Sequence, residues 1–136
     1  MQGFLERVKL EAIMADGRVG RLRHAIVAAV DPKTHTVKVT IQPEGVESGW
    51  IPDPGFAAGG LRIACPSEVS TQVVVAPVEG DIEQSVIVAR IFDSLMMPPV
   101  SPVTGEAVQP GEIGFFTQQG AYLHLSASGI AIGGDL

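Results

Sequence analysis

The sequence predicts an all-β protein built around a small closed barrel, and two observations support this fold class. The chain has 16 glycines and 10 prolines in 136 residues, and these residues interrupt it at short intervals, which favours short strands over helices. Residues 18–93 contain five or six short apolar segments, a number and spacing typical of a small barrel. Because 46% of the residues are hydrophobic, we expect one domain with a core of its own and a short appendage.

The clearest hairpin is predicted at residues 71–93. Two apolar runs rich in β-branched residues, Val73–Val75 and Val86–Phe92, flank the polar turn Glu79-Gly80-Asp81. Glycine adopts the positive φ of a tight turn at little cost, so this pattern predicts a strand, a turn and a returning strand. The two-residue period of a strand predicts that alternate valines of each run face the core.

A second hairpin is predicted before it. Arg18–Asp31 reads as a long strand, a turn follows at Pro32, and Thr36–Ile41 alternates between apolar and polar residues. Asp can bond its own backbone and Pro presets φ, so both suit the turn. On the long strand, the expected core face holds Leu22, Ile26, Ala28 and Val30.

Shorter strands at Trp50-Ile51 and Leu61–Cys65 complete a barrel expected over residues 17–93. Residues 1–16 are predicted to form a short helix, because apolar residues in Phe4–Met14 recur at near-helical spacing. The expected barrel core consists of Val37, Val39, Trp50, Val73, Val75, Val86 and Val88.

The pattern changes after residue 93. Residues 94–111 contain four prolines and no periodicity, which predicts an extended linker. Residues 112–136 contain two alternating fragments, Ala121–Ser126 and Gly129–Gly133. Two strands this short are not stable alone, so the segment must dock on the barrel or associate with copies of itself. The apolar stripe expected to mediate association consists of Leu123, Leu125, Ile130 and Ile132.

Charge and composition argue against several classes of protein. Residues 1–40 carry a net charge of +3 and residues 41–136 a net charge of −9, and aromatic residues are few, so no direct nucleic-acid binding is expected. No apolar run reaches the roughly 18 residues that span a bilayer, and no signal-peptide pattern begins the chain. We therefore expect a soluble protein that is not exported by a classical signal. Cys65 is the single cysteine, which excludes a disulfide framework or a cysteine-based zinc site.

The sequence offers little for catalysis. His24, His35 and His124 are not spaced as metal ligands; His35 is expected to be solvated in a turn, and His124 to lie on the polar face of its fragment. Asp81 and Glu83 could share a strand face, but a solvated turn explains them more simply. Nucleotide-binding and nucleophile motifs are absent. We expect no catalytic residues, metal or cofactor, and a binding or structural role rather than an enzyme.

Three pieces of the sequence, taken in order, resemble a known family. They are Arg23–Asp31 with the hairpin into Val37-Lys38-Val39, then Ser48-Gly49-Trp50-Ile51-Pro52, then Gln72–Phe92 with its Glu79-Gly80-Asp81 turn. This series is similar to the baseplate assembly protein V family, the central spike proteins of contractile-tailed phages such as Mu and P2. The resemblance covers roughly residues 4–133.

The resemblance implies an OB-fold barrel, a homotrimer, and a C-terminal intertwined β-structure on the three-fold axis. It further implies a structural virion protein in the tail baseplate, made in the host cytoplasm, that caps the tail tube through a hub protein and supports genome ejection. The host outer membrane would be met only indirectly.

Two features depart from the family pattern. Ser70 stands where many members have Gly before the Gln-Val strand. Many members also continue into a long β-helix with a His-x-His iron site, whereas this chain has only His124-Leu125-Ser126, so neither metal nor piercing tip is carried over. Either a separate tip or needle protein docks on the stub, or the chain is a shortened form.

Alternatives to the phage spike are the equivalent spike of a tailocin or secretion machine and an OB-fold ligand-binding module. The basic N-terminal segment would contact another baseplate protein or simply be solvated.

Overall fold

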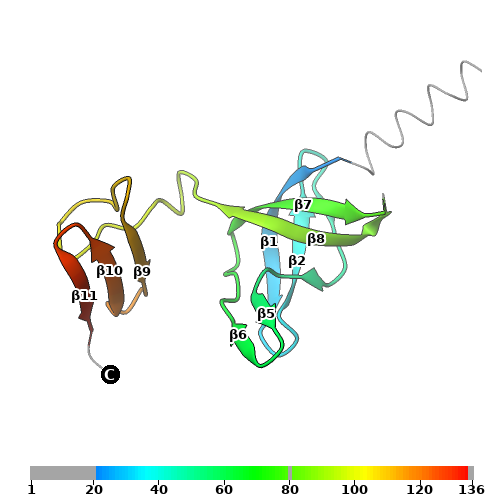
Figure 1. Ribbon diagram of the computed structural model, residues 1–136. Helices are drawn as coiled ribbons and strands as arrows, with labels where there is room; N and C mark the ends of the chain where they lie inside the picture. The colour runs from blue at the N-terminus through cyan, green and yellow to red at the C-terminus, as the bar shows by residue number, and fades with distance from the viewer. Residues whose placement is uncertain (1–20, 80, 135–136) are drawn as a thin grey trace, which may run out of the picture. The chain divides into compact units, whose positions relative to one another are not determined.

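The computed structural model (Figure 1) describes residues 21–79 and 81–134, apart from the side chains of residues 81–83. The chain divides into two compact units, Met1–Asp93 and Ser94–Leu136. Every described element is a β-strand, which confirms the predicted all-β class. The helix predicted within residues 1–16 lies outside the described residues. No helix in the described part is long and apolar enough to cross a membrane.

The first unit is built on one antiparallel six-stranded sheet, with the strand order β3-β2-β1-β7-β8 and β4 paired to β2. A separate hairpin, β5–β6, is paired only within itself. In Figure 1 the sheet curls around β1 and β2, and β5 and β6 lie at its lower end. The strands are β1 (Arg23–Asp31), β2 (Thr36–Ile41), β3 (Val46–Glu47), β4 (Ile51–Pro52), β5 (Phe56–Ala58), β6 (Leu61–Ile63), β7 (Gln72–Val78) and β8 (Asp81–Ile91).

Strand β1 is the centre of the sheet because it pairs with β2 on one side and with β7 on the other. Ala25 lies opposite Val73, and Val27 lies opposite Val39. A register shift between Val27 and Ala29 then changes the phase of the strand, as a β-bulge does.

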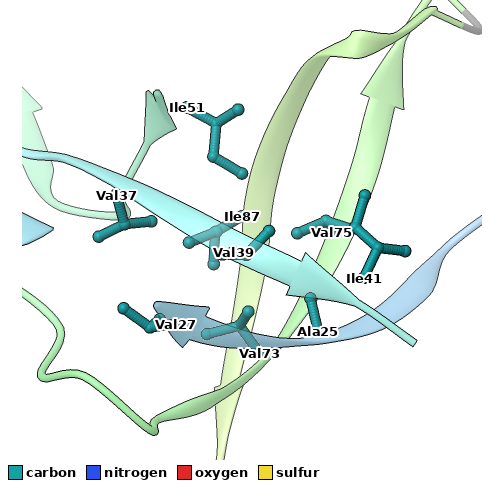
Figure 2. Close-up of a cluster of buried hydrophobic side chains, with 9 residues drawn as sticks. All are labelled: Ala25, Val27, Val37, Val39, Ile41, Ile51, Val73, Val75 and Ile87. Atoms are coloured by element: carbon teal, nitrogen blue, oxygen red, sulfur yellow. The ribbon is translucent and has the colours of Figure 1, made fainter. Parts of the chain in front are cut away.

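The core of this unit is entirely aliphatic (Figure 2). Its side chains come from β1, β2, β4, β7 and β8 and point toward one another between the curled strands. Each valine or isoleucine side chain in it contributes about 1.5–3 kcal/mol when it is fully buried. The core consists of Ala25, Val27, Val37, Val39, Ile41, Ile51, Val73, Val75 and Ile87.

The face of β1 that is buried differs from the expected face. Ala25 and Val27 are buried, whereas Leu22 and Ile26 are exposed. Both faces of this strand carry apolar residues, so alternation alone did not distinguish them. The neighbouring strands decide the phase, because Ala25 and Val27 meet the valines of β7 and β2.

Four of the expected core residues, Val37, Val39, Val73 and Val75, are fully buried. The expected phase of β8 is reversed, because Ser85 and Ile87 face the core while Val88 is half exposed and Val86 only partly buried. Two register shifts in the β7–β8 pairing, at Val74/Val75 and at Pro77/Val78, break the simple alternation.

Trp50 also differs from the expectation, since half of its surface is exposed. Its neighbour Ile51 enters the core instead. The indole ring lies under the Lys38 ammonium, 5.3 Å from its centroid, which is a cation–π distance. This contact holds the ring against the outside of β2.

A buried carboxylate fixes the long connection between β4 and β7. Asp53 is 7% exposed and accepts hydrogen bonds from the Ser67 backbone N–H at 2.7 Å and the Ser67 hydroxyl at 2.8 Å. The Arg90 guanidinium lies 3.4 Å away and donates to the Pro54 carbonyl at 2.7 Å. Asp53 thereby links both ends of the connection to β8, and no motif in the sequence indicated this role.

A matched pair of substitutions tests the phase of β8. Ile87→Asp should destabilise the first unit by about 3–5 kcal/mol, because it buries an unpaired charge. Val88→Asp, one residue along, should change stability by only about 0.5 kcal/mol. Thermal melting followed by circular dichroism measures both. Equal losses of stability in the two variants would show that Ile87 and Val88 do not lie on opposite faces of β8 as described.

Candidate functional site

The second unit is a small antiparallel sheet with the strand order β11-β10-β9. Its strands are β9 (Ile113–Phe116), β10 (Tyr122–Ser126) and β11 (Gly129–Gly133). The sequence predicted the last two strands but not β9, which has four residues between the turn at Gly111 and the loop at Thr117. The alternation of Ile113 and Phe115 with Gly114 was its only signal.

One face of this sheet is apolar across all three strands. In the register of the sheet, Leu125 lies between Ile113 and Ile130, and Leu123 lies between Phe115 and Ile132. The structure thus brings together the four residues expected to mediate association and adds two from β9. We call this set the apolar face: Ile113, Phe115, Leu123, Leu125, Ile130 and Ile132.

The apolar face is largely uncovered within its own unit. Ile132 is 77% exposed and Ile130 is 70% exposed, with Phe115 at 60%. Leu123 and Leu125 on the central strand are less exposed because both neighbouring strands flank them. A contiguous exposed apolar surface of this kind is a candidate association site.

The opposite face of β10 is closed by a hydrogen-bonded cluster. His124 is 1% exposed; its Nδ1 lies 2.7 Å from the Ser101 hydroxyl and its Nε2 lies 3.1 Å from a Glu112 carboxylate oxygen. A carboxylate can only accept from Nε2–H, so in the neutral ring Nδ1 accepts the Ser101 proton. The Phe116 ring meets the imidazole edge-on, with 5.9 Å between centroids. We call Ser101, Glu112 and His124 the histidine clasp.

The histidine clasp connects residues 100–112 to the sheet. Ser101 N–H donates to the Glu106 carbonyl, and Gly105 N–H donates to the Ser101 carbonyl, each at 2.8 Å. Val100 also bridges to Ala107. This part of the chain therefore belongs to the second compact unit rather than forming the expected extended linker.

A serine, a histidine and a carboxylate in series also make up a nucleophilic triad. Here Ser101 is completely buried, and its oxygen accepts a hydrogen bond from Val103 N–H at 3.2 Å, so no substrate can reach it. The clasp is a structural cluster. Among the described residues, no group of three or more potential metal ligands lies together.

The other histidines lie apart from this cluster. The exposed His24 has its Nδ1 3.5 Å from the Gln72 side-chain amide. His35 is half-buried rather than solvated, and its Nδ1 lies 3.0 Å from the Asp53 carbonyl oxygen.

Glu112 has a pKa below its ordinary value. The main cause is the backbone N–H of Gln109, which donates to the carboxylate at 3.1 Å. Burial raises the pKa and partly offsets this effect, while the hydrogen bond and charge of His124 lower the pKa further. The carboxylate form therefore stabilises the folded second unit.

Comparison with known proteins identifies the first unit as an injector OB domain. Residues 23–92, just over half of the chain, match the family model of the type VI secretion system/phage-baseplate injector OB domain. The chain belongs to this family, which confirms the resemblance and the OB fold. Its role is therefore structural and associated with a baseplate, which argues against an enzyme. No curated protein matches the chain. The apolar face and the clasp lie outside the matched residues.

The histidine clasp predicts an acid transition confined to the second unit. Because the folded pKa of Glu112 is lowered, its stabilisation is present above the unfolded value of about 4.3 and is lost as the pH falls through the folded pKa. Glu112→Gln should remove this acid dependence and should weaken the unit at neutral pH. The acid transition is measured by following the amide NMR signals of Leu123–Leu125 from neutral to acidic pH.

Glu106→Gln is the matched control, since the Glu106 side chain is exposed and lies outside the clasp. It should leave the acid transition of β10 unchanged. If Glu106→Gln and Glu112→Gln changed the acid transition of β10 equally, Glu112 would have no special role in it.

Proposed function

We propose that this protein is the trimeric central spike of a contractile phage tail baseplate. In this role it closes the tail tube through a hub protein and supports the membrane-piercing tip during genome ejection. The observation that carries the proposal is the apolar face, which is uncovered in a unit that follows a baseplate OB domain. The virion tail baseplate is the corresponding location, after synthesis in the host cytoplasm.

The geometry of the second unit suits closure around a three-fold axis. Three sheets can form the walls of a prism with each apolar face turned inward, so that every copy covers the other two. Burying the exposed parts of these six side chains contributes about 1 kcal/mol per side chain, which across three copies offsets the cost of association. Strands β9 and β11 are the edges of the sheet, and neighbouring copies would protect them.

The separation of the chain into two units supports a division of roles. The first unit has a core of its own, so it can fold without help from the second unit. The second unit is small and leaves its apolar residues exposed, so it draws stability from association. In a spike, the second unit would hold the trimer and offer a seat for a separate tip or needle protein, while the barrels face the hub.

A secretion or tailocin spike is the second candidate, because the matched family description covers both type VI secretion and phage baseplates. The same trimer would serve either machine. An OB-fold ligand-binding module is less favoured, since the net charge of −6 opposes binding to nucleic acid.

The oligomer is tested by placing charges on the apolar face. The double variant Leu125→Asp, Ile132→Asp should sediment as a monomer, because charges from three copies would meet at the axis. The unaltered chain should sediment at three times the 14.2 kDa chain mass. Ser128→Asp adds a charge at an exposed turn beside the face and should remain trimeric. A monomeric unaltered chain would exclude the spike.

Removing the second unit tests the division of roles. A chain cut after Asp93 should keep its β-rich circular dichroism and its cooperative melting, because its core is complete. It should also sediment as a monomer or a much weaker oligomer. A truncated chain that stays a tight trimer would instead assign the trimer interface to the barrels.

A further inference from the structure

The β5–β6 hairpin presents a second exposed apolar surface, on the first unit. Phe56 pairs with Ile63 and Ala58 with Leu61, so these four residues lie on one face of the hairpin. Phe56 is 52% exposed and Ile63 is 61% exposed. An isolated two-stranded hairpin is only marginally stable in water. Exposed apolar residues on this hairpin therefore suggest that another molecule covers them.

Two adjoining hollows border this hairpin. One, of about 420 Å³, is lined by residues of the hairpin and of β8, including Phe56, Ile63 and Val88. The other, of about 690 Å³, is lined by the hairpin and by the β1–β2 turn, including Lys33 and His35. The hollows share Gly55, Phe56 and Ile63, so they adjoin along the hairpin. We call the two hollows together the hairpin surface. Its apolar centre is Phe56, Ile63 and Val88 of the first hollow. Its basic rim is Arg90 of the first hollow with Lys33 and Arg62 of the second, and Arg62 lies on the opposite face of the hairpin from Phe56 and Ile63.

The rim of the hairpin surface is basic although the chain as a whole is acidic. Three of the nine Lys and Arg residues lie there, in a chain of net charge −6. Lys33 and Arg62 are exposed, and neither forms an ion pair within the described part of the chain. The carboxylate that lines the hollows, Asp53, is buried and already bound by Ser67 and Arg90. The rim thus has cations without matching anions.

Two buried polar atoms at this surface also lack a partner. Arg90 Nε and His35 Nε2 have no hydrogen-bond partner among the described residues. Arginine always carries its Nε proton, so this atom is an unmet donor that needs an acceptor. His35 Nδ1 must donate to the Asp53 carbonyl, 3.0 Å away, which leaves Nε2 as an acceptor in the neutral ring and a donor in the charged ring.

We propose that the hairpin surface binds an extended segment of another protein, in which apolar residues alternate with Asp or Glu. The apolar side chains occupy the centre, and the carboxylates, which point to the other side of the extended segment, pair with Lys33 and Arg62. Strand β8 is the last strand in the order of its sheet, so an added strand can extend the sheet there.

The apolar face of the second unit does not suit the hairpin surface as an occupant. The apolar face of the second unit contains no acidic residue among its six members, so it is not complementary to the basic rim. The hairpin surface and the apolar face therefore serve different partners, and the assignment does not depend on the trimer.

The test uses the full chain and a short synthetic peptide in which Glu alternates with Val and Phe. The amide NMR signals of residues 55–64 and 88–90 should shift on titration, while those of β9–β11 stay in place. The double variant Lys33→Glu, Arg62→Glu should weaken binding about tenfold, as expected for the loss of two exposed ion pairs and the gain of repulsion. The same variant should bind a peptide with Lys in place of Glu more tightly than the unaltered chain does.

Two controls separate this surface from general effects of charge and folding. Arg21→Glu reverses an exposed charge outside the hairpin surface and should leave the affinity within about twofold. A peptide with Ser in place of Val and Phe should not bind, because the apolar centre would be left empty. Shifts confined to β9–β11, or equal binding of the acidic and basic peptides, would overturn the proposal. A lower sedimentation mass of the double variant would assign the surface to contact between copies instead.

Discussion

The two-residue period of strand β10 is the constraint on which the second unit depends. His124 lies between Leu123 and Leu125, and successive side chains of a strand point to opposite faces. When the histidine clasp holds the imidazole on one face of the sheet, both leucines therefore point to the opposite face. The buried hydrogen bonds of His124 need complete pairing, because an unpaired polar group in that position would be costly. Residues 100–112 supply this pairing and cover the polar face. The apolar face stays uncovered because the same segment cannot cover both sides of the sheet.

Asp53 has a comparable position in the first unit. The residues between β4 and β7 include a hairpin that makes no strand pairing with the main sheet, and the carboxylate joins both ends of this region to Arg90 on β8. Asp53 and Arg90 neutralise each other in this attachment. Lys33 and Arg62, the other cations at the rim of the hairpin surface, are therefore the ones that can pair with the proposed partner. These contacts hold the ends of the hairpin in place, and the basic character of its surroundings comes from Lys33 and Arg62, which they do not involve.

These two surfaces suit the mechanics of an injector. The apolar face has no charged member, so the association that it drives should be strong and insensitive to salt. The hairpin surface combines apolar residues with exposed cations, which favours selection of a partner and faster encounter. In the proposed spike, a chain with both surfaces would hold its own copies permanently and still recognise a different protein through its barrel.

Much of this arrangement could be predicted from the sequence. The all-β class, the two hairpins and the stripe of Leu123 with Ile132 follow from local alternation and turn residues, which act over a few neighbours. The family was recognisable because its strands and turns occur in a fixed order. Strands β1 and β8 carry apolar residues on both faces, so alternation alone did not show which face is buried. The neighbouring strands and the register shifts placed Val27 and Ile87 in the core.

The polar clusters were decided by tertiary structure alone. Ser101 and His124 are 23 residues apart, and Asp53 and Arg90 come from separate parts of the chain, so no local pattern marks them as partners. The sequence by itself determined most of the segments that form strands, although not β3, β5 or β9, and four of the residues on the apolar face. The tertiary structure decided which face of each strand is buried, because burial depends on what the rest of the chain places against that face.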